Sequence, residues 1–345
     1  MPEAERSVLH MLPHAGGGGE TYVDVLSAMP GYRFHRVHIT ARRKAPVGEV
    51  AVGLLDVARR LRGHDLLHVH GEATAGLFLP LLAARPSVVT LHGLHLLRRS
   101  SGLGRRAAAL NLGAVVRAAS RTICVSNTER DELARAVGAP ALRRVVVVHN
   151  GVRVAPPATD VERAAVRTEL GLDPTEPVAI WVGSLDERRD PLLAVRAALA
   201  TATPLLFVGE GPLRAETERA ARPPVHVLGQ RDDVPRLLAA SDVFVLVSER
   251  EGLSFGLLEA MAHGLPAIVV DVPENIEAVG DSGLAIPYGD EAALVAGLQR
   301  LGRDGRERTE LGERARRRVA ELFAADEMIA RTRAVYEEVL TARSV

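Results

Sequence analysis

The chain has 345 residues, and its 43 lysine and arginine side chains are balanced by 43 aspartate and glutamate side chains. A zero net charge argues against binding to nucleic acid or to anionic lipid through bulk charge. The balance is uneven along the chain, because residues 1–150 carry a net charge of +9 and residues 151–345 a net charge of −9. Two halves of opposite sign predict two domains with different roles.

The composition also bears on the compartment. A single cysteine, Cys124, rules out an internal disulfide and favours a reducing environment. The first residues lack the basic start and apolar run of a signal peptide. The longest apolar run, Ala75–Ala84, is about half the length of a membrane span. We therefore expect a cytoplasmic protein.

Short apolar runs alternate with amphipathic segments of helical length in the first half. The apolar runs predict strands at Val8–Leu12, Phe34–Ile39, Leu66–His70, Ser87–His92, Thr122–Ser126 and Val145–His149. The amphipathic segments predict helices at Tyr22–Met29, Val50–Arg62 and Arg105–Ala118.

A glycine run, His14–Glu20, follows the first predicted strand. It does not match the G-x-G-x-x-G dinucleotide fingerprint, because the last glycine of that motif is missing. It does not match a P-loop, because no Gly-Lys-Ser/Thr follows. Backbone without side chains at a strand-to-helix turn lets an acceptor or another loop approach closely, so Gly17 and Gly18 are candidate contact residues. A flexible loop is the alternative interpretation.

The second half repeats the alternation after a boundary at 151–174, where Pro156-Pro157 and Asp173-Pro174 flank a helical segment. Strands are predicted at Val178–Gly183, Leu205–Gly209, Val225–Gly229, Val243–Val247 and Ala267–Val270. Helices are predicted at Pro191–Ala200, Leu213–Ala221, Val234–Ala240, Phe255–His263, Glu291–Leu301, Arg306–Leu322 and Ala325–Leu340. Apolar strands alternating with helices are typical of α/β domains whose parallel sheets bind ligands beyond the carboxyl ends of their strands. We expect two Rossmann-like domains facing each other across a cleft.

The segment Glu251–Met261 follows a predicted strand and opens a helix. The backbone N–H groups at 253–255 would lie at the start of that helix, where the helix dipole stabilises an anion. Carboxylates at Glu251 and Glu259 could accept hydrogen bonds from the hydroxyls of a nucleotide sugar. The alternative is a capped helix with solvated acids, which accounts for Ser254 but not for Glu259 within an apolar run.

Glu251 and Glu259 form an E-x7-E spacing that resembles the donor-site signature of retaining, nucleotide-sugar-dependent glycosyltransferases of family 4, which have the GT-B fold. Neighbouring segments resemble the same family in order and spacing: Val182–Leu185, Arg188–Pro191, Phe207–Pro212, Val227–Gln230 and Ala240–Val243. Segments of the first half also match: His68–Gly71, Val89–Gly93, Ile123–Ser126 and Val148–Val152. The resemblance covers nearly the whole chain.

This resemblance implies three segments with separate roles. Residues 1–155 would form an acceptor-binding Rossmann-like domain, and residues 156–322 would form the Rossmann-like domain that binds the nucleotide sugar. Residues 323–345 would form a helix that crosses back to pack on the first domain.

The resemblance also implies roles for single residues of the donor site. Glu259 would bind the ribose hydroxyls, and Glu251 would face the donor sugar. Arg189 falls where the family has a basic phosphate ligand. The diphosphate would be held by the backbone of Leu253, Ser254 and Phe255.

Strand-end glycines complete this predicted donor site. Gly183, Gly209 and Gly229 would lie beside the donor. The arginine that usually follows the first of them is Ser184 here, which removes one of two phosphate cations. Arg188 is the candidate to replace it.

Three histidines, His68, His70 and His92, lie at predicted strand ends. His92 matches the family histidine that points at the transferred sugar, so we expect it to be catalytic together with Glu251 and Arg189. The three histidines could alternatively bind zinc, but no fourth ligand can be identified. No D-x-D pair lies in a suitable loop, and we expect transfer without a metal or another cofactor.

The stretch from Arg98 to Arg121 is basic, with Arg98, Arg99, Arg105, Arg106, Arg117 and Arg121 among leucine and alanine. Relatives that act on lipid acceptors use such a surface to bind the membrane, so peripheral contact with its inner face is a candidate. A solvated helix face is the alternative interpretation.

Together these features predict a retaining glycosyltransferase that moves a sugar from a nucleotide-diphosphate sugar to the hydroxyl of a glycan, lipid-linked or small-molecule acceptor. Two alternatives stay open: a nucleotide-sugar epimerase of the same fold, and a catalytically weak donor-binding or scaffold protein, for which Ser184 is the main argument. No nucleic-acid partner is expected.

Overall fold

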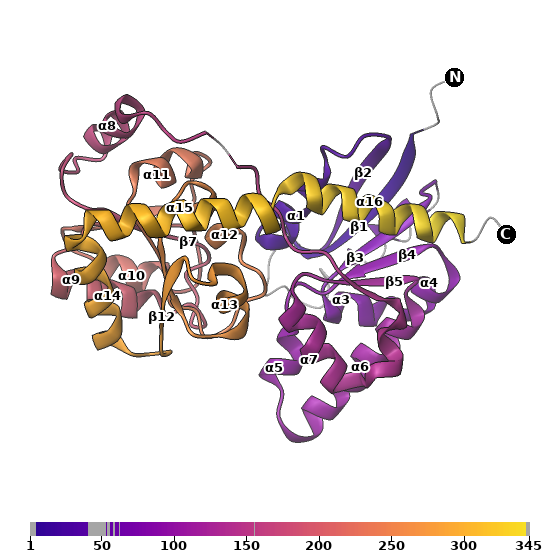
Figure 1. The fold of residues 1–345 in the computed structure, drawn as a ribbon. Coiled ribbons are helices and arrows are strands. Elements are labelled where there is room, and N and C mark those ends of the chain that lie inside the picture. The colour runs from indigo at the N-terminus through magenta and orange to yellow at the C-terminus, as the bar shows by residue number, and fades with distance from the viewer. Residues whose placement is uncertain are drawn as a thin grey trace. The chain divides into compact units, whose positions relative to one another are not determined.

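The computed structural model describes residues 5–40, 53, 56–57, 59–61, 63–154 and 156–342. It divides into two compact units (Figure 1). Unit 1 consists of Met1–Asn150 and Ala325–Val345, and unit 2 of Gly151–Ala324. Each unit is built around one six-stranded parallel sheet.

The sheet of unit 1 has the strand order β2-β1-β3-β4-β5-β6. Its strands are β1 Arg6–His14, β2 Tyr32–Thr40, β3 Leu66–His70, β4 Ser87–Thr90, β5 Arg121–Cys124 and β6 Val145–Val147. Strands β3 and β4 are buried along their whole length, as strands covered by helices on both faces must be. The helices are α1 Gly18–Leu26, α3 Glu72–Leu77, α4 Leu79–Ala84, α5 His95–Arg99, α6 Gly102–Ala118, α7 Asn127–Val137, the 3-10 helix η1 Ala139–Arg144, and α16 Ala325–Thr341.

The last helix, α16, belongs to unit 1 although the whole of unit 2 separates it in sequence from the other elements. It contacts α1 and β4 and buries an apolar face that includes Met328, Val335 and Val339. Tyr336 is fully buried, and its hydroxyl lies 2.5 Å from Nδ1 of His68. The C-terminal helix therefore completes the core of unit 1, as the predicted fold requires.

The sheet of unit 2 has the order β12-β11-β10-β7-β8-β9, so the strand order reverses between β10 and β7. Its strands are β7 Ala179–Val182, β8 Leu205–Val208, β9 Val225–Gly229, β10 Val243–Leu246, β11 Ala267–Val270 and β12 Gly283–Ile286. Its helices are α8 Asp160–Glu169, α9 Pro191–Thr201, α10 Arg214–Ala220, α11 Val234–Ala240, α12 Phe255–Ala262, α13 Pro273–Val279, α14 Glu291–Arg303 and α15 Gly305–Leu322. Open parallel sheets bind ligands where the strand order reverses, beyond the carboxyl ends of the strands.

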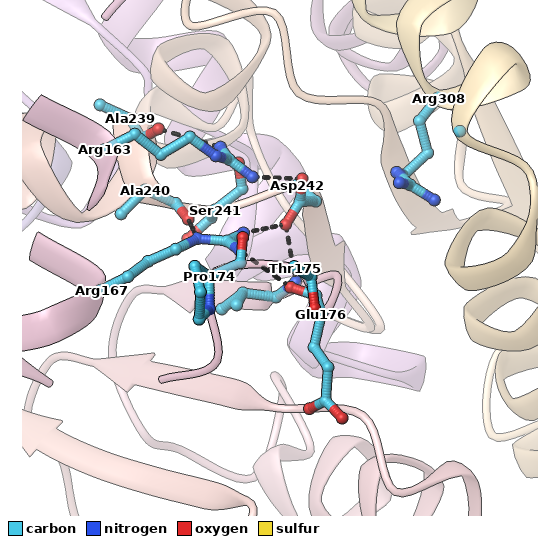
Figure 2. A network of polar contacts seen from close by, with 12 residues as sticks. Arg163, Arg167, Pro174, Thr175, Glu176, Ala239, Ala240, Ser241, Asp242 and Arg308 are labelled. Carbon is cyan, nitrogen blue, oxygen red and sulfur yellow. Dashed lines mark hydrogen bonds and ion pairs between the residues drawn. The ribbon is translucent and has the colours of Figure 1, made fainter. Parts of the chain in front are cut away.

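A buried ion-pair network fixes α8 to the start of β10 (Figure 2). Arg163 and Arg167 of α8 pair with the two carboxylate oxygens of Asp242, and Arg167 Nη2 lies 2.5 Å from Oδ2. The Arg167 side chain is 3% exposed. Its remaining donors bond to backbone carbonyls, those of Ala240, Asp173, Pro174 and Glu176. The N–H of Val178 donates to Oδ2 of Asp242 at 2.7 Å, so this carboxylate also holds the segment that leads into β7.

The chain enters and leaves unit 2 at neighbouring positions. The N–H of Val152 donates to the carbonyl of Phe323 at 2.9 Å. Val152 and Ala324 form an isolated parallel bridge. Both ends of unit 2 are therefore tied together by backbone hydrogen bonding.

These sheets confirm the predicted fold class, and every predicted strand occurs with ends within two residues of the prediction. The predicted helix Val50–Arg62 falls largely outside the described residues. Among the described elements, those without a prediction are α3, α4, α5, α7, η1, α13 and β12. No helix in the described part of the chain combines the length and the apolar character that crossing a bilayer requires.

Candidate active site

Three glycines end neighbouring strands of unit 2. Gly183, Gly209 and Gly229 stand at the carboxyl ends of β7, β8 and β9, and the N–H of Gly209 donates to the carbonyl of Gly229 at 2.8 Å. A Cβ at position 209 would lie 1.9 Å from the carbonyl oxygen of Gly183, so only glycine permits this approach. The three predicted glycines thus form one edge of backbone without side chains.

Helix α12 begins beside this edge, where the strand order reverses. Ser254 is its N-cap and accepts a hydrogen bond from the N–H of Leu257 at 3.5 Å. Gly256 lets the first turn pack closely, since a Cβ there would lie 3.1 Å from the carbonyl oxygen of Val182. Among the described residues, none accepts a hydrogen bond from the N–H of Phe255 or Gly256. These donors, at the positive end of the helix dipole, can bind an anion.

Arg189 and Glu251 form an ion pair at the same edge. Arg189 Nε lies 3.1 Å from Oε1 of Glu251, and Nη2 lies 3.3 Å from Oε2. The two side chains are 18% and 7% exposed. A Cβ at Gly183 would lie 1.9 Å from Nη1 of Arg189, so the guanidinium rests directly on the glycine backbone. The structure therefore brings together three residues that the sequence motifs predict as site residues.

Arg188 has a different carboxylate partner. Its Nη2 lies 3.2 Å from Oδ2 of Asp186, and its carbonyl accepts a hydrogen bond from the N–H of Glu249 at 2.8 Å. Each arginine of the Arg188–Arg189 pair is thus matched by a carboxylate. A diphosphate bound at this edge would compete with these two carboxylates for the two arginines. The N–H donors of α12 would therefore contribute more to binding the diphosphate than the two positive charges alone suggest.

Glu259 lies within α12 among buried neighbours, Leu257, Leu258, Ala260 and Met261. Burial raises the pKa of its carboxyl to about 7. No hydrogen bond from another described residue reaches this carboxylate, which distinguishes it from Glu251. A half-buried acid without a compensating donor is suited to accept hydrogen bonds from a ligand.

Sequence reasoning missed two residues of this region. Asp186 lies in the loop after β7 and neutralises Arg188. Gly256 supplies the close approach of α12 to β7. A glycine within the first turn of a predicted helix is the signal that could have identified Gly256, because glycine is unfavourable there unless packing requires it.

A cluster of buried imidazoles lies on one face of the sheet of unit 1. His10, His68 and His70 are at most 1% exposed, and His92 lies two residues after the end of β4. His10 Nδ1 lies 2.9 Å from His70 Nε2, and His70 Nδ1 lies 2.8 Å from His92 Nε2. The His68 ring stacks on His70 with the ring centroids 4.4 Å apart, but its hydrogen bonds go elsewhere, with Nε2 at 2.7 Å from Oγ1 of Thr90. The structure thus brings the three predicted histidines together and adds His10, which sequence analysis placed only within an apolar strand.

Burial lowers the pKa of all four imidazoles. The pKa values of His10, His68 and His70 lie well below 6.5, and that of His92 is lowered to about 4. The neighbouring imidazoles and Arg36 add smaller effects in the same direction on His10 and His70. These histidines are neutral at physiological pH.

The zinc alternative can be compared with this geometry. One nitrogen from each of His10, His68 and His70 lies within 4.8 Å of the others, so these three, rather than the predicted trio with His92, are close enough to share an ion. Both nitrogens of His68 already bond to side-chain oxygens, those of Thr90 and Tyr336. An ion would therefore have to displace these bonds.

The loop that carries His92 is held by two acidic side chains. His92 has a positive φ of 59°, uncommon for a residue with a side chain. The N–H of the next residue, Gly93, donates to Glu129. The other Glu129 oxygen accepts from the N–H of Val125 at 2.7 Å, and Glu72 accepts from the N–H of Leu96. The His92 ring is thus fixed by its backbone as well as by His70.

The glycine run forms the turn from β1 to α1. Gly17 is the N-cap of α1 with a φ of 79°, and Gly18 is the first helical residue. A Cβ at Gly17 would meet no atom within 4 Å, so this turn leaves open space beside its backbone. The positive φ accounts for glycine at position 17, and the role in acceptor contact stays a prediction.

The basic stretch divides into paired and exposed arginines. Arg98 pairs with Glu132, and Arg121 pairs with Glu338. Arg105 and Arg106 are exposed at the start of α6. Beside them on α6, the side chains of Leu103 and Leu110 are 81% and 75% exposed. A surface cavity of about 370 Å³ along α6 is lined by Arg106, Ala109, Leu110, Gly113, Arg117, Ala136 and Val137.

Two family models match the chain, one in each half. "Glycosyltransferase Family 4" matches residues 30–155, and "Glycosyl transferases group 1" matches residues 176–304. The second match contains Arg189, Glu251 and Glu259.

Curated relatives carry glycosyltransferase or synthase names. The chain is 32% identical over 187 residues to N-acetyl-alpha-D-glucosaminyl L-malate synthase of Bacillus anthracis, covering 51% of this chain and 49% of the relative. It is 30% identical over 232 residues to the Escherichia coli UDP-Gal:alpha-D-GlcNAc-diphosphoundecaprenol alpha-1,3-galactosyltransferase, covering 61% and 59%. The matches thus span about half of each of these relatives. A D-inositol 3-phosphate glycosyltransferase of Streptomyces bingchenggensis is 30% identical over 80% of this chain and 67% of its own length.

Solved structures share the fold at lower identity. Sucrose-phosphate synthase of Thermosynechococcus elongatus has a TM-score of 0.81 at 22% identity, covering 98% of this chain and 100% of that one. HepE of Anabaena, in complex with UDP and glucose, has a TM-score of 0.81 at 17% identity, covering 96% and 100%. The sequence matches and the two six-stranded sheets agree: the chain belongs to glycosyltransferase family 4 and has the GT-B fold.

Proposed function

We propose that the protein is a retaining glycosyltransferase that uses a nucleotide-diphosphate sugar. The main support is the set of charged and N–H groups at the edge of the unit 2 sheet where the strand order reverses, between β10 and β7. There, the Arg189–Glu251 pair rests on Gly183 beside the free N–H donors of α12. This combination offers donors to a diphosphate and carboxylates to hydroxyls, the two halves of a nucleotide sugar.

Each donor-binding residue has a proposed role. Glu259 accepts hydrogen bonds from the ribose hydroxyls, and Glu251 faces the sugar. Arg189, assisted by Arg188, shares its charge with the diphosphate. The backbone of Leu253, Ser254 and Phe255 contacts the phosphate oxygens, and the glycine edge at Gly183, Gly209 and Gly229 leaves room for them. Unit 1 binds the acceptor, with Gly17 and Gly18 in contact and His92 directed at the sugar.

The transfer exchanges one bond for another on the same face of the sugar. The bond from the anomeric carbon to the diphosphate oxygen breaks, and its electron pair stays on the diphosphate. The acceptor oxygen bonds to the anomeric carbon, and its proton passes to the departing phosphate oxygen. Arginine and helix N–H groups stabilise the charge that develops on the leaving group, so the step needs no metal.

A thermal-shift series with nucleoside diphosphates and their sugars tests this proposal. We expect one nucleotide class to stabilise the protein, and the matching sugar to be transferred to an acceptor with retained anomeric configuration. An inverted product would overturn retention. Donor consumption with a changed sugar epimer and no acceptor would indicate an epimerase, and stabilisation without turnover would indicate a binding protein.

We also propose peripheral contact between α6 and the inner face of the membrane. The support is that Leu103 and Leu110 are exposed beside Arg105 and Arg106, a combination that favours anionic bilayer surfaces. Co-sedimentation with anionic vesicles at low salt should fall when both leucines are changed to serine. Absence of wild-type binding under these conditions would remove the proposal.

A further inference from the structure

Three imidazoles form a hydrogen-bonded row across the sheet of unit 1. They come from neighbouring strands: His10 from β1, His70 from β3, and His92 from the end of β4. The separations are 2.9 Å from His10 Nδ1 to His70 Nε2 and 2.8 Å from His70 Nδ1 to His92 Nε2. His10, at one end of the row, is buried in the interior of unit 1. His92, at the other end, is partly exposed. We call it the histidine row.

Hydrogen bonding couples the proton positions along this row. A neutral imidazole has one N–H donor and one bare nitrogen acceptor, so each ring that donates on one side must accept on the other. Only two arrangements satisfy both bonds. In the outward arrangement, Nδ1 carries the proton in all three rings, and the open nitrogen of His92 is a donor. In the inward arrangement, Nε2 carries the proton in all three rings, and the open nitrogen of His92, Nδ1, is an acceptor.

The buried end of the row decides between these arrangements. Nε2 of His10 is buried and has no hydrogen-bond partner among the described residues. Arg36 is the register partner of His10 on the adjacent strand β2, and its positive charge acts on His10 and His70. Arg36 is itself paired with Glu20 and Asp24, which weakens but does not reverse this effect. A positive charge beyond the end of the row favours a bare nitrogen there and not an N–H.

We propose that the histidine row locks His92 as the Nδ1–H tautomer and so presents a fixed, neutral hydrogen-bond donor to a sugar or phosphate oxygen. His10 and His70 are positioning residues, because they act through His92 and do not touch the ligand. The hydrogen-bonding state of His92 stands on the geometry of unit 1 alone. Its consequence for sugar transfer rests on the proposed function.

Nitrogen-15 NMR of histidine-labelled protein reads the tautomer directly. The His92 resonances, assigned with His92→Gln, should show a protonated Nδ1 and a bare Nε2 in the wild-type protein near pH 7. A wild-type His92 with the proton on Nε2, the form that a free neutral imidazole prefers, would overturn the proposal. So would a stoichiometric metal ion found at these histidines in the purified protein.

A matched pair of variants separates the row from ordinary core packing. His70 and His68 lie two residues apart on β3 and are 1% and 0% exposed. His70→Phe removes the ring that bonds to Nε2 of His92, so His92 should change to the Nε2–H form that a free neutral imidazole prefers. His68→Phe removes a ring that packs against the row but hydrogen-bonds only to Thr90 and Tyr336, so His92 should keep Nδ1–H. Equal tautomers in the two variants would contradict the inference, and the wild-type spectrum remains decisive if either variant fails to fold.

The kinetic consequence is a separate readout. If the proposed transfer is observed, His70→Phe should lower kcat about three- to tenfold with KM nearly unchanged, as expected for a weakened hydrogen bond to the reacting sugar. His68→Phe should leave kcat within about twofold at matched folded fraction. A protein without transfer activity would refute the proposed function, and the NMR result would still decide the histidine row.

Discussion

The carboxyl group of Glu259 belongs to an otherwise apolar stretch of helix α12. The folded-state pKa is raised to about 7 from 4.5, so the folded protein holds this proton more tightly than the unfolded chain. The burial cost is absent below about pH 4.5 and grows as the pH rises towards 7. A binding site can tolerate such a cost because a ligand that donates hydrogen bonds to the carboxylate removes part of it.

We therefore predict that Glu259→Gln stabilises the ligand-free protein at pH 8 but not at pH 4.5. The gain at pH 8 should reach at most about 3.5 kcal/mol, since one pKa unit corresponds to about 1.4 kcal/mol. Denaturant unfolding at the two pH values measures it. A variant that is less stable than the wild type at pH 8 would contradict the burial argument.

The same carboxylate predicts a pH dependence of donor binding. Hydroxyl donors favour the ionised form, so binding expels the proton, and affinity for the stabilising nucleoside diphosphate should rise up to about tenfold per pH unit between pH 5 and 7. Titration calorimetry measures this slope. Glu259→Gln should bind more weakly at pH 8 and lose the slope; a retained slope would assign the titration to another group.

Arg189 and Arg188 differ in what they touch, although they are adjacent in sequence. Arg189 lies on Gly183 and pairs with Glu251, whereas Arg188 pairs with Asp186. We predict that Arg189→Gln lowers kcat/KM by about a hundredfold and Arg188→Gln by about tenfold, the scale of losing one charge-assisted contact to a leaving group. Steady-state kinetics at matched folded fraction measures both. If neither loss weakens turnover, phosphate neutralisation lies elsewhere.

At the scale of elements, Asp242 holds α8, β10 and the approach to β7 together. Asp242→Asn should destabilise unit 2 by about 3–5 kcal/mol, because it leaves the buried guanidinium of Arg167 without its counter-charge. Arg196→Gln is the control, since Arg196 and Glu291 form a pair with side chains 52% and 43% exposed. That change should cost less than about 1 kcal/mol. Equal losses of stability in the two variants would show that the Asp242 ion pairs contribute no more than an exposed surface ion pair.

How much of the fold the sequence predicts depends on the length and burial of each element. Strands such as β8 and β10 are short, wholly apolar and fully buried, and their boundaries are legible as hydrophobic runs. Helices α3 and α5 have six and five residues, too few for a helical period to show. Strand β12 pairs with one neighbour only and is partly exposed, and its sequence Gly-Leu-Ala-Ile contains only two large apolar residues, so its apolar run is too short to stand out.

The candidate site shows a similar division. The E-x7-E spacing predicts Glu251, Glu259 and the start of α12 because these residues are close in sequence. The pairing of Arg189 with Glu251 joins residues 62 positions apart, and the contact of His10 with His70 joins residues 60 apart. Such contacts depend on strand order and register, which a single sequence does not encode locally.

At the scale of the whole molecule, the predicted chemistry assigns all charge stabilisation to protein groups. Transfer should therefore persist in excess chelator, with a rate within about twofold of the untreated enzyme. Adding back magnesium or manganese ions is the control. A loss with chelator that is restored by one of these ions would replace the arginine and helix N–H groups with a metal in the leaving-group step.

Removal of α16 tests how unit 1 is completed. A chain ending at residue 324 loses the buried Tyr336 and exposes His68 and the neighbouring face of β4. Hydrogen exchange should then lose protection across β1, β3 and β4, while unit 2 keeps its protection and its response to nucleotides. The segment 151–324 expressed alone is the control. Wild-type protection of β1 in the truncated chain would contradict this prediction.

The closed ends of unit 2 have a consequence for the order of events during synthesis. Because Val152 bonds to Phe323, every residue that unit 2 needs has been made before α16 is translated. The strands of unit 1 are synthesised before unit 2, but the helix α16 that covers their histidines is synthesised after it. The sheet of unit 1 is therefore the part of the nascent protein that chaperones have most time to bind.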